Sequence, residues 1–232
     1  MNSNPAFLSS SELHALRLLD SCVVANAIET FDTRLRNEGF ANGSLRCLFP
    51  QLDSMVGYAA TLKIRGSAPA TAGGLYSDRT DWWDYIESLP FPRVVVVQDV
   101  ATRVGLGSFL GAVHVNILKA LGCVGAVTNG SVRDLPRAQA LGFQLFSESL
   151  TVSHAYVHIV EFGSPVEIAG LEIKSGDLLH GDQHGVQSIP LHLAGKIPAV
   201  AARIKEKEEA IIELCQSAEF SLEKLRATLA SQ

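Results

Sequence analysis

A regular alternation of strand-like and helix-like segments between Arg93 and Ser147 constrains the fold more than any other feature of the sequence. It begins with the β-branched run RVVVVQDV, which is typical of a strand buried on both faces. There follow the Gly-rich turn GLGSFLGA, the helical segment AVHVNILKALG, the strand CVGAVTNG, the short helix LPRAQALG and the strand FQLFS. This order predicts a parallel sheet with right-handed crossovers, so the turns after the first two strands meet at one edge. Ligands of open α/β sheets bind at that edge.

The segments that flank this unit have a different character. Before it, SSSELHALRLLD and SCVVANAIETF predict two helices, with Ser10 as the N-cap of the first. MVGYAATLKIRG predicts a strand, and the loop GSAPATAGGLYSD separates it from the helical segment RTDWWDYIESL. After about residue 151, short runs punctuated by Gly and Pro predict antiparallel hairpins packed on the parallel part. Residues 199–215 have the pattern of an amphipathic helix.

We expect one domain over residues 1–232, because no low-complexity linker and no internal repeat divides the chain. Its core spans about 50–190, with a helical segment over 9–32 and a helical tail over 192–230. A chain of 232 residues that is 47% hydrophobic is large enough to bury a real core.

Composition and charge argue against several classes of protein. The net charge is -5 and the sequence has no basic block, so direct binding to nucleic acid is not expected. The four cysteines are scattered without a CxxC pair, so neither a zinc site nor a disulfide framework is indicated, and a reducing compartment fits best. The sequence has no signal-like N-terminus and no apolar run of membrane-spanning length, so we expect a cytoplasmic protein that does not bind membranes.

The stretch VTNGSVRD contains a candidate site. In an extended chain, Arg133 and Asp134 would point to opposite faces, but Asn129 and Gly130 suggest a turn that lets both side chains face one cleft. Arg133 is a forked donor suited to a carboxylate, and Asp134 is a hard oxygen ligand suited to Mg²⁺ or Mn²⁺. The alternative is a surface turn whose two charges are only solvated.

The helix that begins near Ala112 lies one crossover earlier on the same predicted sheet edge. Its first turn, Gly111, Ala112, Val113 and His114, would offer backbone N–H groups and the positive end of a helix dipole to an anion. Together these features predict a pocket for a small anionic oxo acid.

Two longer stretches carry a resemblance. GSFLGAVHVNILKALGCVGAVTNGSVRD, followed by SPVEIAGLEIKSGDLLHGDQHGVQSIP, resembles the RraA-like family, which includes 4-hydroxy-4-methyl-2-oxoglutarate/4-carboxy-4-hydroxy-2-oxoadipate aldolases and the RraA regulators of ribonuclease E. The likeness runs from about Val56 to Pro190. It implies an α/β fold, an αββα sandwich of the swivelling phosphohistidine-domain-like type, here with a C-terminal helix, assembled as a homotrimer or a dimer of trimers.

The resemblance also implies roles for individual residues. Asp134 would hold the divalent metal, Mg²⁺ or Mn²⁺, and the substrate would contact Arg133 and the backbone of Gly111, Ala112, Val113 and His114. Arg133 and Asp134 would thus be the catalytic residues of a lyase that cleaves a C–C bond of a small 2-oxo acid, through a metal-stabilised pyruvate enolate. The activity would be that of a 4-hydroxy-2-oxo acid aldolase, an oxaloacetate decarboxylase, or both.

The chain departs from the family pattern at two positions. The family's aldolases usually carry an acid where this chain has Ala112, and a second acid near the N-terminus is replaced by Asn26. Either another group completes the site, or the substrate differs, or catalytic activity has been lost. A non-catalytic, protein-binding regulator of a ribonuclease is therefore the alternative function.

Other polar and aromatic residues are given structural roles or left open. We expect His114 to be a packed residue rather than a base, and His180, Asp182 and His184 to form hydrogen bonds in a hairpin turn. His154 and His158 are not assigned to the site. Trp82 and Trp83 are expected to cover an apolar surface or an interface. A carboxylate could come from the C-terminal segment of a neighbouring subunit, from one of Glu208, Glu209 and Glu213.

Overall fold

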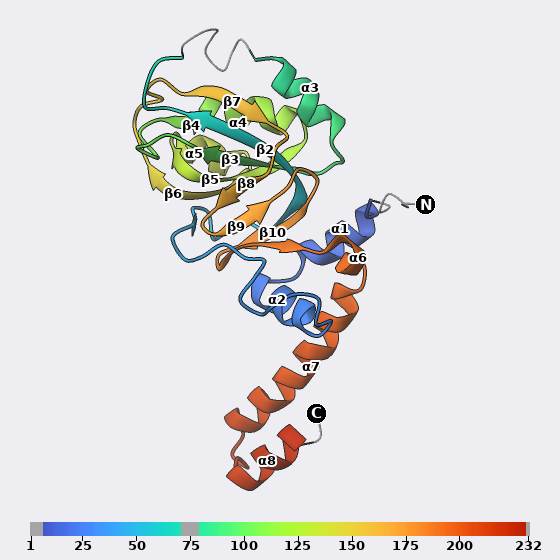
Figure 1. Ribbon diagram of the computed structural model, residues 1–232. Coiled ribbons are helices and arrows are strands. Elements are labelled where there is room, and N and C mark those ends of the chain that lie inside the picture. Colours follow the sequence, from blue (N-terminus) through green and yellow to red (C-terminus); the bar gives the residue numbers. More distant parts are fainter. Residues whose placement is uncertain (1–6, 71–78, 231–232) are drawn as a thin grey trace.

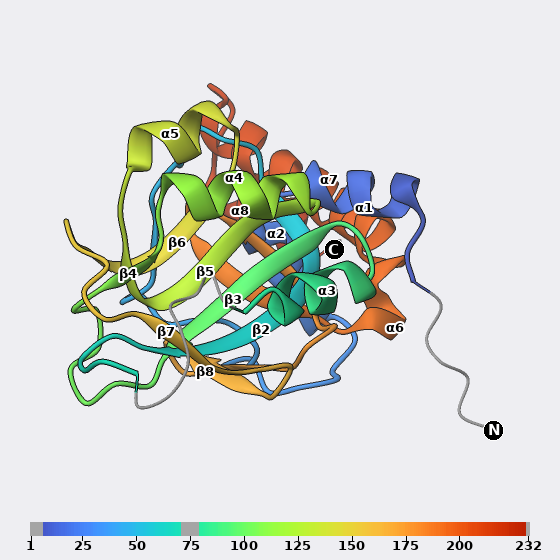
Figure 2. The ribbon, with the colours of Figure 1, turned by 90° about the horizontal axis from the view of Figure 1, so that it is seen from above.

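The parallel unit predicted from the sequence lies at the centre of the protein (Figure 1). The computed structural model describes residues 7–70 and 79–230. β3 (Arg93–Asp99), β5 (Cys123–Val132) and β6 (Gln144–Leu150) run parallel and are joined by α4 (Ala112–Ala120) and α5 (Leu135–Ala140). Figure 2 shows α4 and α5 side by side over these strands. The predicted β-α-β-α-β order is confirmed.

Further strands extend this unit into a mixed sheet in the order β1-β6-β5-β3-β2-β10-β11. β2 (Met55–Arg65) is parallel to β3, whereas β10 pairs with β2 in antiparallel fashion. The other strands are β1 (Arg46–Cys47), β4 (Ser108–Leu110), β7 (His158–Phe162), β8 (Val166–Ile168), β9 (Leu171–Ile173), β10 (Leu178–Asp182) and β11 (Gly185–Ile189). β8 with β9 and β10 with β11 are antiparallel pairs, so the hairpins predicted after residue 151 are confirmed.

Alternating valines of β3 divide the core between the two faces of the sheet. Val95 and Val97 pack with helices α3 (Asp81–Ser88), α4 and α5, whereas Val94 and Val96 pack with the β8–β9 hairpin. All four valines are fully buried, which suits the continuous β-branched run of this strand. Burial of each side chain contributes roughly 1.5–3 kcal/mol to the free energy of unfolding. Trp82 belongs to the same core on the helical side and Trp83 packs against it, so the expected apolar role of both is confirmed.

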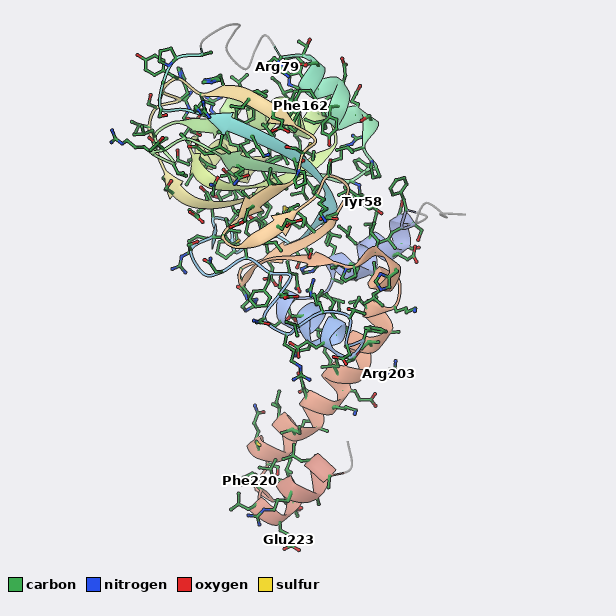
Figure 3. The ribbon with its side chains drawn as sticks, in the orientation of Figure 1. Tyr58, Arg79, Phe162, Arg203, Phe220 and Glu223 are labelled. Atoms are coloured by element: carbon green, nitrogen blue, oxygen red, sulfur yellow. The ribbon has the colours of Figure 1, made fainter. Side chains whose placement is uncertain are left out.

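The N-terminal and C-terminal helices form a separate cluster against the start of β2 and against β10 and β11. The cluster contains α1 (Ser10–Arg17), α2 (Ser21–Glu29), α6 (Leu191–Ala194) and the first turns of α7 (Ile197–Gln216). Tyr58 of β2 belongs to it, and its hydroxyl accepts a hydrogen bond from Leu8 N at 2.9 Å (Figure 3).

The predicted N-cap Ser10 is wrong by one residue. Ser9 has extended backbone angles and caps α1, and its hydroxyl accepts a hydrogen bond from Glu12 N while the Glu12 carboxylate accepts one from Ser9 N at 2.8 Å. Three serines in a row satisfy the sequence pattern equally well, and only the spacing to Glu12 selects Ser9.

The last two helices project from the body as an arm. α7 leaves the helical cluster after Ile204, and α8 (Leu222–Ala230) folds back along its far end (Figure 1). Phe220 and Glu223 lie at the tip of this arm, and Arg203 lies nearer the body (Figure 3). The predicted helix over 199–215 is confirmed and is slightly longer than expected.

The predicted loop over 66–78 extends beyond the described residues, because 71–78 lie outside them. The segment GLGSFLGA is not only a turn, since residues 108–110 form β4 alongside β5. In the described parts of the chain, no helix combines the length and apolar character needed to cross a membrane.

Candidate active site

The N-terminus of α4 lies close to Arg133 and Asp134, the two residues that follow β5. Gly111 is the N-cap of α4, with an extended backbone and no side chain to cap the helix. A Cβ atom at this position would lie 3.0 Å from Arg133 Nε and 3.1 Å from Asp134 Oδ2. Glycine at position 111 therefore allows the two charged side chains to approach the start of the helix closely.

The chain turns at Asp134 rather than at Asn129 and Gly130, so the predicted turn was placed wrongly. β5 continues through both residues to Val132, with a shift in register between Thr128 and Ser131. Asp134 then adopts a left-handed backbone conformation, with φ 57° and ψ 35°. This conformation is accessible to Asp and Asn at modest cost.

The carboxylate of Asp134 caps α4 from a different part of the chain. Asp134 Oδ2 accepts a hydrogen bond from Ala112 N at 2.8 Å. A second contact joins the same two segments, because the N–H of Arg133 donates a hydrogen bond to Leu110 O at 3.1 Å. The two crossovers of the parallel sheet are thus joined at the edge where the sequence predicted the site.

The side chains of Arg133 and Asp134 face the same space. Arg133 Nε lies 3.7 Å from Asp134 Oδ2, and the two side chains remain 34% and 41% exposed. Arg133 Nη1 also donates to Val152 O at 3.2 Å. An ion pair this open to solvent contributes little to stability, so both groups can interact with a ligand at small cost.

These side chains line a cavity of about 430 Å³. The lining residues are Val132, Arg133, Asp134, Leu135, Leu150, Thr151 and Val152. Leu150 is the last residue of β6, and Thr151 and Val152 follow it; these three were not predicted, because the sequence pattern ended this strand at Ser147. The parallel topology was a usable signal, since it places the end of this strand at the same edge as Asp134.

His114 is a packed residue, as the sequence favoured. Its side chain is buried, its ring centroid lies 4.1 Å from that of Phe109, and Nδ1 lies 2.9 Å from Phe109 O. Because a carbonyl only accepts, Nδ1 carries the proton. Burial lowers the pKa of His114 to about 4, although the hydrogen bond to Phe109 acts in the opposite direction. The ring is therefore neutral near pH 7.

The two departures from the family pattern lie in different parts of the chain. Ala112 is at the candidate site, where its N–H binds Asp134. Asn26 lies on α2, and its side-chain amide donates to Glu208 Oε1 of α7 at 3.4 Å. Figure 1 shows α2 below the sheet, beside α7 and away from α4. Glu208, Glu209 and Glu213 are exposed on α7.

The donor set of the site fits a hard divalent cation held mainly by water and substrate. Asp134 supplies a partly exposed carboxylate, and Mg²⁺ in proteins keeps several waters and binds through one or two carboxylates. Within the described residues, no group of three or more His, Cys, Asp or Glu side chains converges on one point.

The remaining histidines serve the structure. His180 is fully buried, and its ring nitrogens contact Ser21 Oγ and the carbonyls of Leu16 and Leu19. Asp182 Oδ1 accepts a hydrogen bond from His184 N at 2.8 Å in the β10–β11 turn. His154 and His158 are at least partly exposed and lie next to backbone carbonyls of neighbouring residues.

A larger cavity of about 580 Å³ lies at the opposite end of the parallel strands, between α1 and the sheet. Arg17 and Asp53 line it and are paired with each other at 2.6 Å. The smaller cavity is the better candidate for chemistry, since Arg133 and Asp134 line it and both remain partly exposed.

Comparisons with known proteins agree with this fold. A family model described as RraA-like, Aldolase/RraA, matches residues 21–187, which include the whole candidate site. A protein of Halalkalibacterium halodurans named "Putative 4-hydroxy-4-methyl-2-oxoglutarate aldolase" is 27% identical over 171 residues, covering 70% of this chain and 78% of that protein. An uncharacterized protein of Methanocaldococcus jannaschii is 30% identical over 138 residues, covering 57% of this chain and 65% of that protein.

Solved structures resemble the whole chain. A crystal structure of Streptomyces coelicolor RraAS2, described as an unusual member of the RNase ES inhibitor RraA protein family, matches with a TM-score of 0.69 and 22% identity, covering 88% of this chain and 96% of that chain. An uncharacterized protein from Pseudomonas syringae pv. tomato matches with a TM-score of 0.74 and 23% identity over 98% of both chains. The predicted α/β fold with C-terminal helices is confirmed, and the chain belongs to the RraA-like family.

Proposed function

We propose that this protein is a divalent-metal-dependent lyase that cleaves a C–C bond of a small 2-oxo acid. The observation that supports this most strongly is that Arg133 and Asp134 line one cavity while the Asp134 carboxylate also binds the backbone at the first turn of α4. The reaction would be aldol cleavage of a 4-hydroxy-2-oxo acid, decarboxylation of oxaloacetate, or both.

Binding of the substrate would use charges already present. The Ala112 N–H donates to the Asp134 carboxylate, so the start of α4 already accommodates an anionic oxygen. A substrate carboxylate placed beside Gly111 and Val113 would add a second negative charge near Asp134. Arg133 and a cation would compensate that charge, which is a physical reason for a metal at this position.

Each residue has a defined part in the proposed mechanism. Asp134 would hold Mg²⁺ or Mn²⁺, which when bound would withdraw electrons from the 2-oxo group. Arg133 would bind the carboxylate and stabilise negative charge that develops on the 2-oxo oxygen during bond breaking.

A regulator that binds a ribonuclease is the second candidate function. It is favoured by Ala112, which removes an acid that the family's aldolases usually carry, and by the likeness to RraAS2. A regulator would act through its outer surface and would not need Asp134. Inhibition of a ribonuclease that is unaffected by Asp134→Asn would support this second function.

The proposed lyase function is tested by pyruvate release from oxaloacetate and from 4-hydroxy-2-oxo acids, with Mg²⁺ or Mn²⁺ and then with a chelator. Arg133→Ala is expected to lower kcat/KM about 100-fold, the magnitude typical of a lost charge-stabilising donor. Arg137→Ala, which removes an exposed arginine of α5, is the matched control and should leave kcat/KM unchanged. A folded protein that releases no pyruvate from any of these substrates would refute the lyase.

The proposal includes assembly as a homotrimer or a dimer of trimers in the cytoplasm, with no membrane and no nucleic acid as a direct partner. Light scattering on the purified full-length chain measures the mass directly. A monomer that is fully active would contradict the proposed assembly.

A further inference from the structure

We propose that the larger cavity, between α1 and the sheet, binds a small amphipathic monoanion, a molecule with one carboxylate and an apolar body. The cavity has a volume of about 580 Å³, and small-molecule sites in proteins usually measure roughly 300–1,000 Å³. It lies at the amino ends of the parallel strands, whereas the candidate active site lies at their carboxyl ends. This cavity is thus a second site, and its occupancy does not depend on the proposed lyase function.

The floor of the cavity is apolar and shielded from solvent. It consists of Leu13, Met55 and Val56, each of which lines the cavity and is at most 9% exposed. Val124, near the start of β5, adds a partly buried apolar side chain. An apolar group that replaces water against this floor would gain free energy on binding.

Polar contacts fix α1 over the sheet on both sides of the cavity. Before α1, Leu8 N donates a hydrogen bond to the hydroxyl of Tyr58 at 2.9 Å. At the last residue of α1, Arg17 Nη2 lies 2.6 Å from Asp53 Oδ2. Because the walls are held by the fold itself, a ligand would order few groups when it binds.

The rim of the cavity, formed by its exposed lining residues, carries an excess of positive charge. Asp53 is the one acid among the described residues that line the cavity, and it is paired with Arg17. Lys119, in the last turn of α4, forms no ion pair within the described part of the chain. His14 also lines the rim and adds no negative charge. Since the whole chain has a net charge of -5, this local excess favours an anion over a cation.

The floor and the rim together select the class of ligand. An apolar body would cover the floor, and one carboxylate at its end would stay at the rim beside Lys119, where it keeps part of its hydration. Phe91, which is 65% exposed and lines the cavity, offers its ring to the apolar body. A small, fully polar oxo acid would leave the floor in contact with water, so it is a poorer ligand for this cavity.

Calorimetric titration of the full-length protein with 4-phenylbutyrate tests the proposal. This compound joins an aromatic ring to one carboxylate through a flexible chain. 4-Phenylbutan-1-ol has the same body without the charge, and butyrate has the charge without the ring. We expect 4-phenylbutyrate to bind at least about tenfold more tightly than either comparison compound, because each of these lacks one of the two interactions.

Variants test whether the cavity is responsible. Lys119→Glu reverses the charge at the rim and should weaken the binding of 4-phenylbutyrate at least about tenfold, whereas Lys119→Arg should keep the affinity within about threefold. Phe91→Ala should weaken it about three- to tenfold through the lost apolar contact. Lys196→Glu, on an exposed position before α7 and outside the cavity, is the matched control and should leave the affinity unchanged. Arg133→Ala should leave it unchanged as well, because Arg133 lines the other cavity.

Each outcome decides for or against this second site. Binding of 4-phenylbutyrate that is tighter than that of both comparison compounds and is weakened by Lys119→Glu supports it. Absence of binding, whether the cavity stays empty or a second copy of the chain fills it, would overturn it. Equal affinities for the acid and the alcohol, or unchanged affinity in Lys119→Glu, would do the same. Binding that Arg133→Ala weakens and Lys119→Glu does not would place the ligand in the candidate active site and would also overturn it.

Discussion

Asp134 Oδ2 accepts a hydrogen bond from Ala112 N at 2.8 Å, so a carboxylate at the end of one parallel strand caps the helix that follows the previous strand. This contact joins the two crossovers at the sheet edge where α/β proteins bind their ligands. It also gives Asp134 two separable functions, a structural cap and a source of negative charge.

The cap and the charge of Asp134 can be separated by substitution. Asp134→Asn keeps an oxygen acceptor for Ala112 N and tolerates the left-handed backbone, so its free energy of unfolding should stay within about 0.5 kcal/mol of the wild type. Its affinity for Mg²⁺ or Mn²⁺ should fall at least about tenfold, because the charged ligand is lost. Calorimetric titration measures the affinity. Asp84→Asn, on an exposed position of α3, should leave metal affinity unchanged, and unchanged affinity in Asp134→Asn would refute the metal-binding role.

Asp134→Ala should be less stable than Asp134→Asn. It removes the cap and places Ala in a left-handed conformation, two effects of about 1 kcal/mol each. Urea denaturation of both variants gives the difference. Equal stability of the two variants would show that the contact with Ala112 N contributes nothing to the fold.

Gly111→Ala should impair the site with little effect on stability. The backbone of Gly111 is extended, so Ala is compatible with it, but the added Cβ would lie 3.0 Å from Arg133 Nε and 3.1 Å from Asp134 Oδ2. Displacement of these groups should lower kcat/KM about 10- to 100-fold. Gly43→Ala, where no atom lies within 4 Å of the added Cβ, is the matched control. Full activity in Gly111→Ala would show that the close approach of Arg133 and Asp134 to Gly111 does not matter for the reaction.

The free energy of unfolding should decrease as the pH is lowered, because the buried His114 ring takes up a proton less readily in the folded chain than in the unfolded chain. Burial lowers the folded pKa of His114 from 6.5 to about 4, so between these values the unfolded chain binds the proton and the folded chain does not. The stabilisation is present above pH 6.5 and is lost as pH falls toward 4, and its size is on the order of 3 kcal/mol. Urea denaturation at pH 7 and pH 5 should show a smaller loss in His114→Gln than in the wild type.

In His114→Gln, the loss of unfolding free energy between pH 7 and pH 5 should be reduced but not abolished. Burial also lowers the pKa of His180, which acts in the same direction. His192→Gln, an exposed residue of α6, is the control and should retain the wild-type dependence. An identical pH dependence in wild type and His114→Gln would contradict the buried, neutral ring.

The correction at the start of α1 is tested by a pair of serine variants. Ser9→Ala removes the side chain that caps the helix and should lower the free energy of unfolding by about 1 kcal/mol. Ser10→Ala, at the first helical position, should change it by a few tenths of a kcal/mol at most. The reverse order in urea denaturation would restore the original assignment of the cap to Ser10.

The sequence predicted the fold where periodicity and topology determine it. The alternation from Arg93 to Ser147 predicted the parallel unit, and right-handed crossovers predicted that Asp134 and the start of α4 share an edge. The exact site of the turn was missed because Asn129 and Gly130 are common turn residues, whereas here they lie within a strand whose register shifts.

The apolar wall of the cavity could not be predicted from local patterns. The last residues of β6, including Leu150, are exposed and have no periodic signal, and Val152 follows the strand end. Their role depends on which neighbouring strand they pair with, which is a property of the whole sheet.

A crystal soaked with oxalate and Mg²⁺ tests the central claim most directly, since oxalate mimics the planar carboxylate and 2-oxo oxygens of the substrate. We predict Mg²⁺ bound to the Asp134 carboxylate, with oxalate between Arg133 and the first turn of α4. Oxalate and Mg²⁺ bound elsewhere, for example in the larger cavity beside Arg17 and Asp53, or the candidate site left empty at saturating concentrations, would contradict it.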